Sequence, residues 1–283
     1  MALSNAVLIT GCSTGIGRAT AERLARGGHV VYATARRLDA VDDLKGAGCR
    51  TLALDVTSEE SMRAAVAAVE EAEGAVGALV NNAGYSQSGA VETVPIDDLR
   101  RQFETNVFGL ARMCQLVLPG MRRQGYGRIV NVSSMGGKLT FPGGGVYHAT
   151  KYAVEALSDA LRFEVKGFGV DVVVIEPGLI KTHFAETVVS EIPDDDGPYG
   201  SFNSAVAAAT AGAYEGPFGK LGGGPETVAK TIERAITARR PRTRYRVTAS
   251  ARLFLAQRRL LPDRAWDRVV ATSFPRPAGN GPS

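Results

Sequence analysis

Three polar side chains in the middle of the chain have the types and the spacing of a proton-transfer site. Tyr147 and Lys151 stand four residues apart, and Ser134 precedes Tyr147 by thirteen residues. On a helix, positions i and i+4 share one face, so the Lys151 ammonium would lie near the Tyr147 phenol. A nearby cation favours phenolate and lowers the pKa of a tyrosine from its usual value of about 10. The spacing predicts a tyrosine that acts as a general acid/base near neutral pH.

A glycine-rich loop near the start of the chain has the position of a dinucleotide-binding turn. Gly11, Gly15 and Gly17 lie between an apolar run, Val7–Thr10, and a helical pattern over Ala19–Arg26. At a strand-to-helix turn, glycines let the backbone approach a pyrophosphate, which the helix N-terminus attracts. The spacing differs from the common Gly-x-Gly-x-x-Gly fingerprint. On its own, the loop is therefore also consistent with a tight structural turn.

The residues after the second apolar run, His29–Ala35, bear on the choice of cofactor. In NAD-binding units a carboxylate about 20 residues beyond the glycines binds the ribose 2′-hydroxyl. Here Arg36 and Arg37 follow the run, and the first acid is Asp39. Guanidinium groups suit a 2′-phosphate, which predicts NADP(H) as the preferred cofactor, with NAD(H) as the alternative. The structural alternative is that both arginines are solvated residues of a loop.

Further apolar runs predict the elements that position these residues. Runs at Cys49–Leu54, Ala78–Val80 and Val170–Ile175 alternate with helical segments, which is typical of a parallel sheet with helices on both faces. Ligands of such sheets bind beyond the carboxyl ends of the strands. The polar and small residues at the predicted strand ends are Asp55, Asn81, Ala83, Gly84, Ser134, Pro177 and Gly178. The sequence predicts a single α/β domain over residues 1–274, a Rossmann-type doubly wound parallel sheet of about seven strands.

In this order, the motifs resemble the short-chain dehydrogenase/reductase family. The residues that carry the resemblance are Thr10-Gly11…Gly15-Ile16-Gly17, Asp55-Val56, Asn81-Asn82-Ala83-Gly84, Asn106, Ser133-Ser134, Tyr147…Lys151 and Pro177-Gly178…Thr182. Two stretches, Val7–Ser13 and Val31–Arg36, further resemble the branch that contains hydroxysteroid and retinol dehydrogenases. The resemblance implies an enzyme that interconverts a carbonyl and an alcohol by hydride transfer.

The resemblance also implies a role for each catalytic residue. Ser134 would hydrogen-bond the substrate carbonyl, and Tyr147 would donate the proton in reduction and accept it in oxidation. Lys151 would lower the tyrosine pKa and bind the nicotinamide ribose. Asn106, inside the apolar helical stretch Leu99–Met121, would mark a helix distortion that holds a water feeding protons to the lysine. Without the resemblance, Asn106 is equally well explained as a solvated polar position.

The cofactor contacts that the resemblance implies come from the glycine loop, the strand ends and the catalytic helix. They are Gly11, Ser13, Thr14, Gly15, Ile16, Gly17, Arg36, Arg37, Asp55, Val56, Asn82, Ala83, Gly84, Tyr147, Lys151, Pro177, Gly178 and Thr182. Thr14 departs from the pattern, because NADP-preferring relatives often carry a basic residue at that position. This departure weakens the prediction of NADP(H) without reversing it.

Two segments are predicted to select a hydrophobic substrate that is steroid-, retinoid- or polyketide-like. Gly136–Val146 carries Phe141 as an apolar wall and glycines that leave room for a ligand. Residues 183–224 combine an acidic patch with an alanine-rich helix, which is typical of a lid over an apolar ligand, although a surface excursion is the alternative. The predicted substrate contacts are Ser134, Phe141, Gly144, Tyr147, His183 and Phe184. His148 lies one residue further round the helix from Tyr147 and is predicted to face elsewhere.

The C-terminal extension, 225–274, is strongly basic. Residues 239–268 contain ten arginines and two aspartates, a net charge of +8 in a chain of net charge +4. Arg242–Val247 predicts the last strand, and Ala251–Val270 predicts an amphipathic helix. Such a helix could lie on an anionic membrane, dock an acidic carrier, or pack on the domain or a partner subunit with its arginines solvated; the last is favoured. Nucleic-acid binding is not expected, because the aromatic residues are not interleaved with the basic ones.

The composition excludes some classes and leaves others open. Three dispersed histidines and three dispersed cysteines give no metal-ligand spacing. Free thiols, with no signal peptide and no membrane-spanning run, predict a cytoplasmic protein with a disordered tail at 275–283. Cys12 would lie beside the cofactor, where modification of its thiol could inhibit the enzyme.

The apolar helices that carry Asn106 and Tyr147 predict a homodimer or homotetramer. The alternative functions are a 3-ketoacyl carrier reductase and a cofactor-binding regulatory protein with little turnover.

Overall fold

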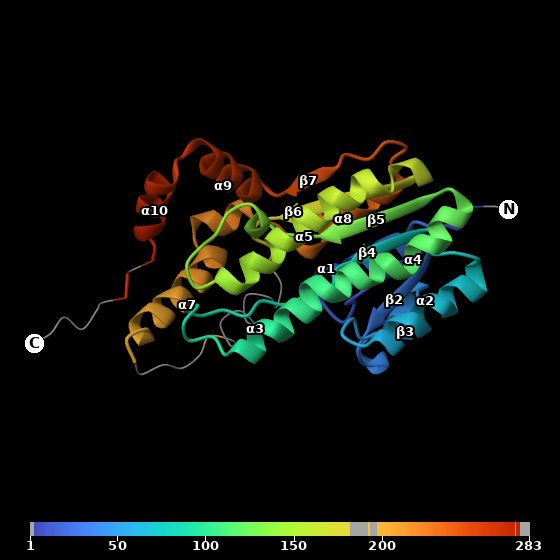
Figure 1. The fold of residues 1–283 in the computed structure, drawn as a ribbon, viewed down its shortest axis with the longest axis horizontal. Helices are drawn as coiled ribbons and strands as arrows, with labels where there is room; N and C mark the ends of the chain where they lie inside the picture. The colour runs from blue at the N-terminus through green and yellow to red at the C-terminus, as the bar shows by residue number, and fades with distance from the viewer. Residues whose placement is uncertain (1–2, 182–191, 193–196, 275, 278–283) are drawn as a thin grey trace, which may run out of the picture.

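The chain forms one parallel sheet in the strand order β3-β2-β1-β4-β5-β6-β7 (Figure 1). The structure, a computed structural model, describes residues 3–181, 192, 197–274 and 276–277. The strands are β1 (Ala6–Ile9), β2 (Val30–Ala35), β3 (Arg50–Ala53), β4 (Ala78–Asn81), β5 (Gly127–Val132), β6 (Val170–Pro177) and β7 (Arg244–Val247). The order reverses direction at β1, which lies between β2 and β4. The predicted doubly wound sheet of seven strands is confirmed.

Helices cover both faces of the sheet. One face is covered by α1 (Gly15–Arg26) and α8 (Pro225–Thr237), and the other by α2 (Glu59–Glu73), α4 (Leu110–Gln124) and α5 (Gly145–Glu164). Four further helices gather beyond the carboxyl ends of the strands (Figure 1): α3 (Ile96–Phe103), α7 (Gly200–Glu215), α9 (Ala249–Leu260) and α10 (Asp263–Ala271). Short 3-10 turns span Leu38–Ala40, Asp42–Ala47, Met135–Gly137, Lys166–Phe168 and Pro217–Leu221.

The central strands are apolar throughout because both of their faces are buried. In β1, Val7 and Ile9 pack toward α1 and α8, whereas Ala6 and Leu8 pack toward α2 and α4. Burying each large aliphatic side chain contributes roughly 1.5–3 kcal/mol before entropy is counted. Two such layers hold the strands in one register, so that their carboxyl ends meet along one edge.

Two predicted helices are interrupted in the structure. The predicted stretch Leu99–Met121 is divided by a π-helical turn at Glu104–Gly109, which is a distortion of the kind that the resemblance implied around Asn106. The predicted single helix Ala251–Val270 is wrong: it forms α9 and α10, because Pro262 has no backbone N–H and cannot continue a helix. The predicted last strand is confirmed as β7, which pairs in parallel with β6.

Parts of the sequence prediction fall on residues that the structure does not describe. Thr182, His183, Phe184 and most of the predicted disordered tail at 275–283 lie outside the described residues. None of the helices in the described ranges has the length and hydropathy needed to cross a membrane.

Candidate active site

A cavity of about 1250 Å³ opens at the carboxyl ends of the strands. It brings together most of the predicted site residues, which come from loops far apart in the sequence. Those that line it are Gly11, Ser13, Thr14, Gly15, Ile16, Arg36, Asp55, Val56, Asn82, Ala83, Gly84, Ser134, Phe141, Gly144, Tyr147, Lys151, Pro177 and Gly178. Three other predicted residues, Gly17, Arg37 and Asn106, do not belong to the lining.

The three residues of the predicted proton-transfer site meet where β5 and α5 come together. Ser134 follows β5, and its Oγ accepts a hydrogen bond of 3.0 Å from the Gly136 amide. Tyr147 lies in the first turn of α5, and Lys151 follows one turn later on the same face. The Lys151 Nζ lies 5.7 Å from the centroid of the Tyr147 ring and donates to the Val132 carbonyl at 2.9 Å.

The burial of Lys151 shapes the electrostatics of this group. Desolvation lowers the pKa of Lys151 to about 8, while the nearby Glu155 carboxylate acts in the opposite direction. Below that pH the lysine is a buried cation close to the phenol. A buried cation acts strongly on its neighbours, because little water screens it. The pair can therefore favour the phenolate form of Tyr147.

Asn106 lies behind the cavity, in the π-helical turn between α3 and α4. Its amide nitrogen donates to the Tyr85 carbonyl at 2.9 Å and to the Thr150 hydroxyl at 3.1 Å. Its amide oxygen accepts from the Tyr85 amide at 3.1 Å. This side chain ties the loop after β4 to the helix that carries Tyr147 and Lys151. It is buried and fully bonded, so the solvated alternative is wrong.

The glycine loop forms a cradle in front of α1. The helix begins at Gly15 without a side-chain cap on its first turn, so its first backbone N–H groups are open toward the cavity. Gly17 lies behind the loop, where a Cβ would overlap the Gly11 carbonyl. The Asn82 amide donates to the Thr10 and Gly11 carbonyls at 3.0 and 2.9 Å and holds the loop against β4. This arrangement fits an anionic pyrophosphate at the helix N-terminus.

The two arginines after β2 differ in their surroundings. Arg36 lines the cavity and makes no ion pair within the described residues. Arg37 pairs with Asp39 at 2.9 Å on the surface and does not line the cavity, so its contact to the cofactor stays a prediction. Among the described residues after β2, Arg36 is therefore the guanidinium that is left without an ion pair in the cavity, which Asp55 and Val56 also line.

The other end of the cavity is mainly apolar and partly built by the C-terminal extension. Phe141 packs against the rings of Phe254 and Trp266 at centroid distances of 5.9 Å each. The apolar lining residues at this end are Met135, Phe141, Leu179, Ile180, Val206, Ala209, Ala213, Phe254, Trp266, Val269, Val270 and Phe274. The sequence predicted the amphipathic pattern of 251–270 but not that its apolar face closes the cavity. Parts of the predicted lid, within α7, also contribute to this lining.

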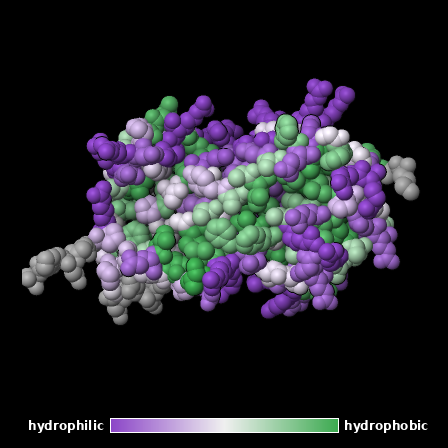
Figure 2. Space-filling model, viewed as in Figure 1, coloured by the Kyte–Doolittle hydropathy of each residue, from purple (hydrophilic) through white to green (hydrophobic). Residues whose placement is uncertain are grey.

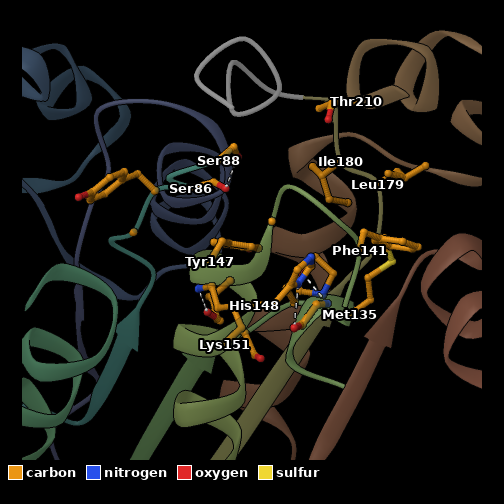
Figure 3. Close-up of a pocket in the computed structure, with 18 of the residues that line it drawn as sticks. Ser86, Ser88, Met135, Phe141, Tyr147, His148, Lys151, Leu179, Ile180 and Thr210 are labelled. Atoms are coloured by element: carbon orange, nitrogen blue, oxygen red, sulfur yellow. Dashed lines mark hydrogen bonds between the residues drawn. The ribbon is translucent and has the colours of Figure 1, made fainter. Parts of the chain in front are cut away.

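Two further expectations from the sequence are wrong. His148, predicted to face elsewhere, lines the cavity and packs edge-on against Phe141 and Tyr147 (Figure 3). It does so because α5 begins at the cavity wall, so that successive side chains of its first turn both reach the interior. Cys12 is fully buried beneath the glycine loop, and burial raises the pKa of its thiol to about 12. Such a thiol does not react readily, so modification of Cys12 offers no route to inhibition.

Comparisons with known proteins agree with this geometry. Residues 5–193 match the short chain dehydrogenase family. The chain is 35% identical over 272 residues to an NADPH-dependent 3-dehydrocapnine reductase of Ornithobacterium rhinotracheale, covering 93% of this chain and 94% of that one. It is 35% identical over 285 residues to the 17-beta-hydroxysteroid dehydrogenase type 6 of Rattus norvegicus, covering 96% and 89%.

A solved short-chain dehydrogenase from Streptomyces avermitilis superposes with a TM-score of 0.77 at 34% identity, covering 95% of this chain and 96% of that one. The fold and the cavity therefore define an α/β oxidoreductase. The chain belongs to the short-chain dehydrogenase family.

Proposed function

We propose that the protein is an NADP(H)-dependent oxidoreductase that interconverts a carbonyl and an alcohol on a hydrophobic small molecule, with Tyr147 as the general acid/base. One observation carries the proposal. Ser134, Tyr147 and Lys151 line the same cavity as the glycine loop and Arg36, with an apolar wall at the far end. The cavity thus combines a proton-transfer group, an anion-binding turn and an apolar compartment.

The proposed proton chemistry uses the hydrogen bond of Ser134 and the contact between Lys151 and Tyr147. Since the Gly136 amide donates to the Ser134 Oγ, the serine hydroxyl proton is free to bond the substrate oxygen. In reduction, Tyr147 gives its phenolic proton to that oxygen, and Lys151 stabilises the phenolate that forms. In oxidation the same groups act in reverse. A bound nicotinamide supplies or accepts the hydride.

The binding of the cofactor would use both ends of the glycine loop. The open N–H groups of α1 suit the pyrophosphate, and Arg36 suits a 2′-phosphate. Asp55 and Val56 would flank the adenine, and the Pro177–Gly178 turn would lie toward the carboxamide. The relative named as an NADPH-dependent reductase supports NADP(H) over NAD(H). Lys151 would bind the nicotinamide ribose, and Asn106 would keep its predicted place on the proton path, behind the lysine.

A turnover screen tests the proposal directly. Purified protein is mixed with NADPH and a set of ketones and aldehydes of increasing hydrophobicity, and the absorbance of the reduced cofactor is followed. Oxidation of NADPH that depends on a hydrophobic carbonyl compound is expected. Tight NADPH binding without turnover of any ketone or alcohol would instead favour the regulatory alternative. Turnover restricted to carrier-bound 3-ketoacyl groups would favour the carrier reductase.

The face that carries α4 and α5 supports a homodimer. Figure 2 shows a hydrophobic band over these helices. Exposed large apolar side chains on this face are Tyr152, Leu157 and Phe163 of α5, at 44%, 42% and 88%, and Phe108 of the π-helical turn before α4 is 56% exposed. Such a surface is explained by a second copy of the chain that covers it. Two copies of the helix pair would then hold the Tyr147 helix rigid.

A further inference from the structure

His148 is a polar side chain in the wall of the cavity that the proposed proton transfer does not use. It is 8% exposed. The ring centroids of Phe141 and Tyr147 lie 6.2 and 5.7 Å from its own, and Figure 3 shows His148 between them. Burying a polar group in apolar surroundings is costly unless it is hydrogen-bonded. Each ring nitrogen is therefore expected to have a hydrogen-bond partner.

One nitrogen of the imidazole is already bonded within the protein. Nδ1 lies 3.0 Å from the Gly136 carbonyl oxygen, which can only accept, so Nδ1 carries the proton. Burial lowers the pKa of His148 to about 4, so the ring is neutral at neutral pH. The remaining nitrogen, Nε2, is therefore an acceptor with a lone pair. Because Gly136 also bonds Ser134, the turn that holds the serine fixes the tautomer of the histidine.

The second nitrogen, Nε2, lies close to Gly144 in the cavity wall. Nε2 has no hydrogen-bond partner within the part of the chain that the structure describes. Gly144 leaves it uncovered, since a Cβ at that position would lie 2.7 Å from Nε2. Gly144, His148 and Phe141 all line the cavity. Phe141 and Tyr147 pack against the two sides of the imidazole, so Nε2 is an acceptor beside the catalytic tyrosine.

We propose that His148 Nε2 accepts a hydrogen bond from the substrate, and that the substrate is a hydrophobic ketone with a hydroxyl or amino donor close to its carbonyl. This inference rests on the proposed function and names its substrate class. Because His148 lies beside Tyr147, whose phenol would meet the carbonyl oxygen, the donor is expected on a carbon close to the carbonyl carbon. A plain ketone leaves Nε2 unpaired against apolar groups, which selects against it.

The test compares substrates that differ only in this donor. A long-chain methyl ketone and the α- and β-hydroxy ketones of the same length are assayed with NADPH, and kcat/KM is measured for each. Two variants distinguish the role of Nδ1 from that of Nε2. His148→Asn places an amide N–H near the position of Nδ1 and removes Nε2. His148→Gln places an amide oxygen near the position of Nε2 and removes the Nδ1 donor.

The readout is the ratio of kcat/KM for the better hydroxy ketone to that for the plain ketone. In the wild type the ratio should be about tenfold or more, the value of one well-placed hydrogen bond. His148→Asn should reduce the ratio to near one, and His148→Gln should keep most of it. A wild-type ratio near one, or a ratio that His148→Asn leaves unchanged, overturns the inference.

A binding measurement keeps the inference separate from the proposed function. The plain alcohol and the corresponding diols are titrated into the protein with NADP+, by calorimetry, for the wild type and His148→Asn. A diol should bind about tenfold more tightly than the alcohol in the wild type and equally in the variant. If no ketone is turned over, the proposed function fails, and equal binding of diol and alcohol by the wild type would additionally overturn the role of His148.

Discussion

At the scale of single residues, the site keeps a charged group and its hydrogen bonds away from water, which would weaken their interactions. The Lys151 ammonium is buried yet satisfied by the Val132 carbonyl, and it lies within reach of the Tyr147 ring. Ser134 is oriented by the Gly136 amide rather than by another side chain. Lys151 and Ser134 are therefore each fixed by a contact to the backbone.

Replacing Tyr147 with phenylalanine tests the acid/base assignment. The substitution keeps the ring and removes the transferable proton, so kcat should fall roughly 10²- to 10⁴-fold. The dissociation constant of NADPH, measured by fluorescence titration, should change little, which shows that the variant is folded. Near-normal turnover would mean that another group transfers the proton.

Substitutions of Arg36 and Arg37, the two arginines after β2, test the preference for NADP(H), with the second substitution as the control for the first. Arg36→Gln removes the free guanidinium from the cavity and should weaken NADPH binding about ten- to a hundredfold, with NADH binding nearly unchanged. Arg37→Gln is the control, because Arg37 is already paired with Asp39 outside the lining. Equal effects of the two substitutions, or tighter binding of NADH than NADPH by the wild type, would contradict the role given to Arg36.

Lys151 is expected to lower the free energy of unfolding, although the proposed chemistry requires it. Its pKa is lowered from 10.5 to about 8 in the folded protein. Between these values the unfolded chain binds the proton and the folded chain does not, so stability rises with pH through this window. The full penalty, of the order of 1–3 kcal/mol, is therefore present below about pH 8.

Lys151→Met removes the buried charge and tests this view. The free energy of unfolding of the cofactor-free protein should rise at pH 7, and the gain should shrink toward pH 10. Urea denaturation at both pH values measures it. A variant that is less stable than the wild type at pH 7 would show that the Lys151–Val132 hydrogen bond outweighs desolvation.

At the scale of elements, the sequence was informative wherever the signal was local. Strand runs followed by small or polar residues predicted the sheet and most of the cavity lining, since these residues must gather at the carboxyl ends of parallel strands. The sequence pattern did not predict those lining residues whose position depends on tertiary contacts. His148 lines the cavity only because α5 begins at its wall, and Trp266 does so only because Pro262 turns α10 back from α9. Neither effect leaves a periodic pattern.

Trp266 offers a test of the part that the C-terminal helices play. It is buried against Met135, Leu139 and Leu179, and its indole N–H points to the Thr140 carbonyl at 3.4 Å. Trp266→Ala should lower the free energy of unfolding by about 3–5 kcal/mol and raise KM for long apolar substrates. Leu260→Ala, at a side chain that is 82% exposed on α9, should change stability by less than about 0.5 kcal/mol. If the Trp266→Ala variant is folded and its KM is unchanged, α10 takes no part in substrate binding.

At the scale of the whole molecule, charge and hydrophobicity are distributed on different surfaces. Arginines concentrate in residues 239–268, whereas three exposed large apolar side chains, Tyr152, Leu157 and Phe163, belong to α5. Leu260, within the basic region, and Phe163, at the end of α5, are both large and highly exposed, at 82% and 88%. Only Phe163 belongs to the hydrophobic band that we assign to self-association.

Substitutions of Phe163 and Leu260 test whether the proposed dimer exists and where its interface lies. Phe163→Glu would place a carboxylate within the proposed apolar contact, and a buried, unpaired charge is strongly disfavoured. The variant should be a monomer at micromolar concentration, with a lower melting temperature, by light scattering and thermal denaturation. Leu260→Glu adds the same charge outside the band and should leave a dimer. A wild-type monomer with full activity would contradict the interface, and dissociation by Leu260→Glu alone would move it to the C-terminal helices. Because Tyr147 and Lys151 stand on the helix that the dimer would brace, loss of turnover is expected to accompany dissociation in Phe163→Glu.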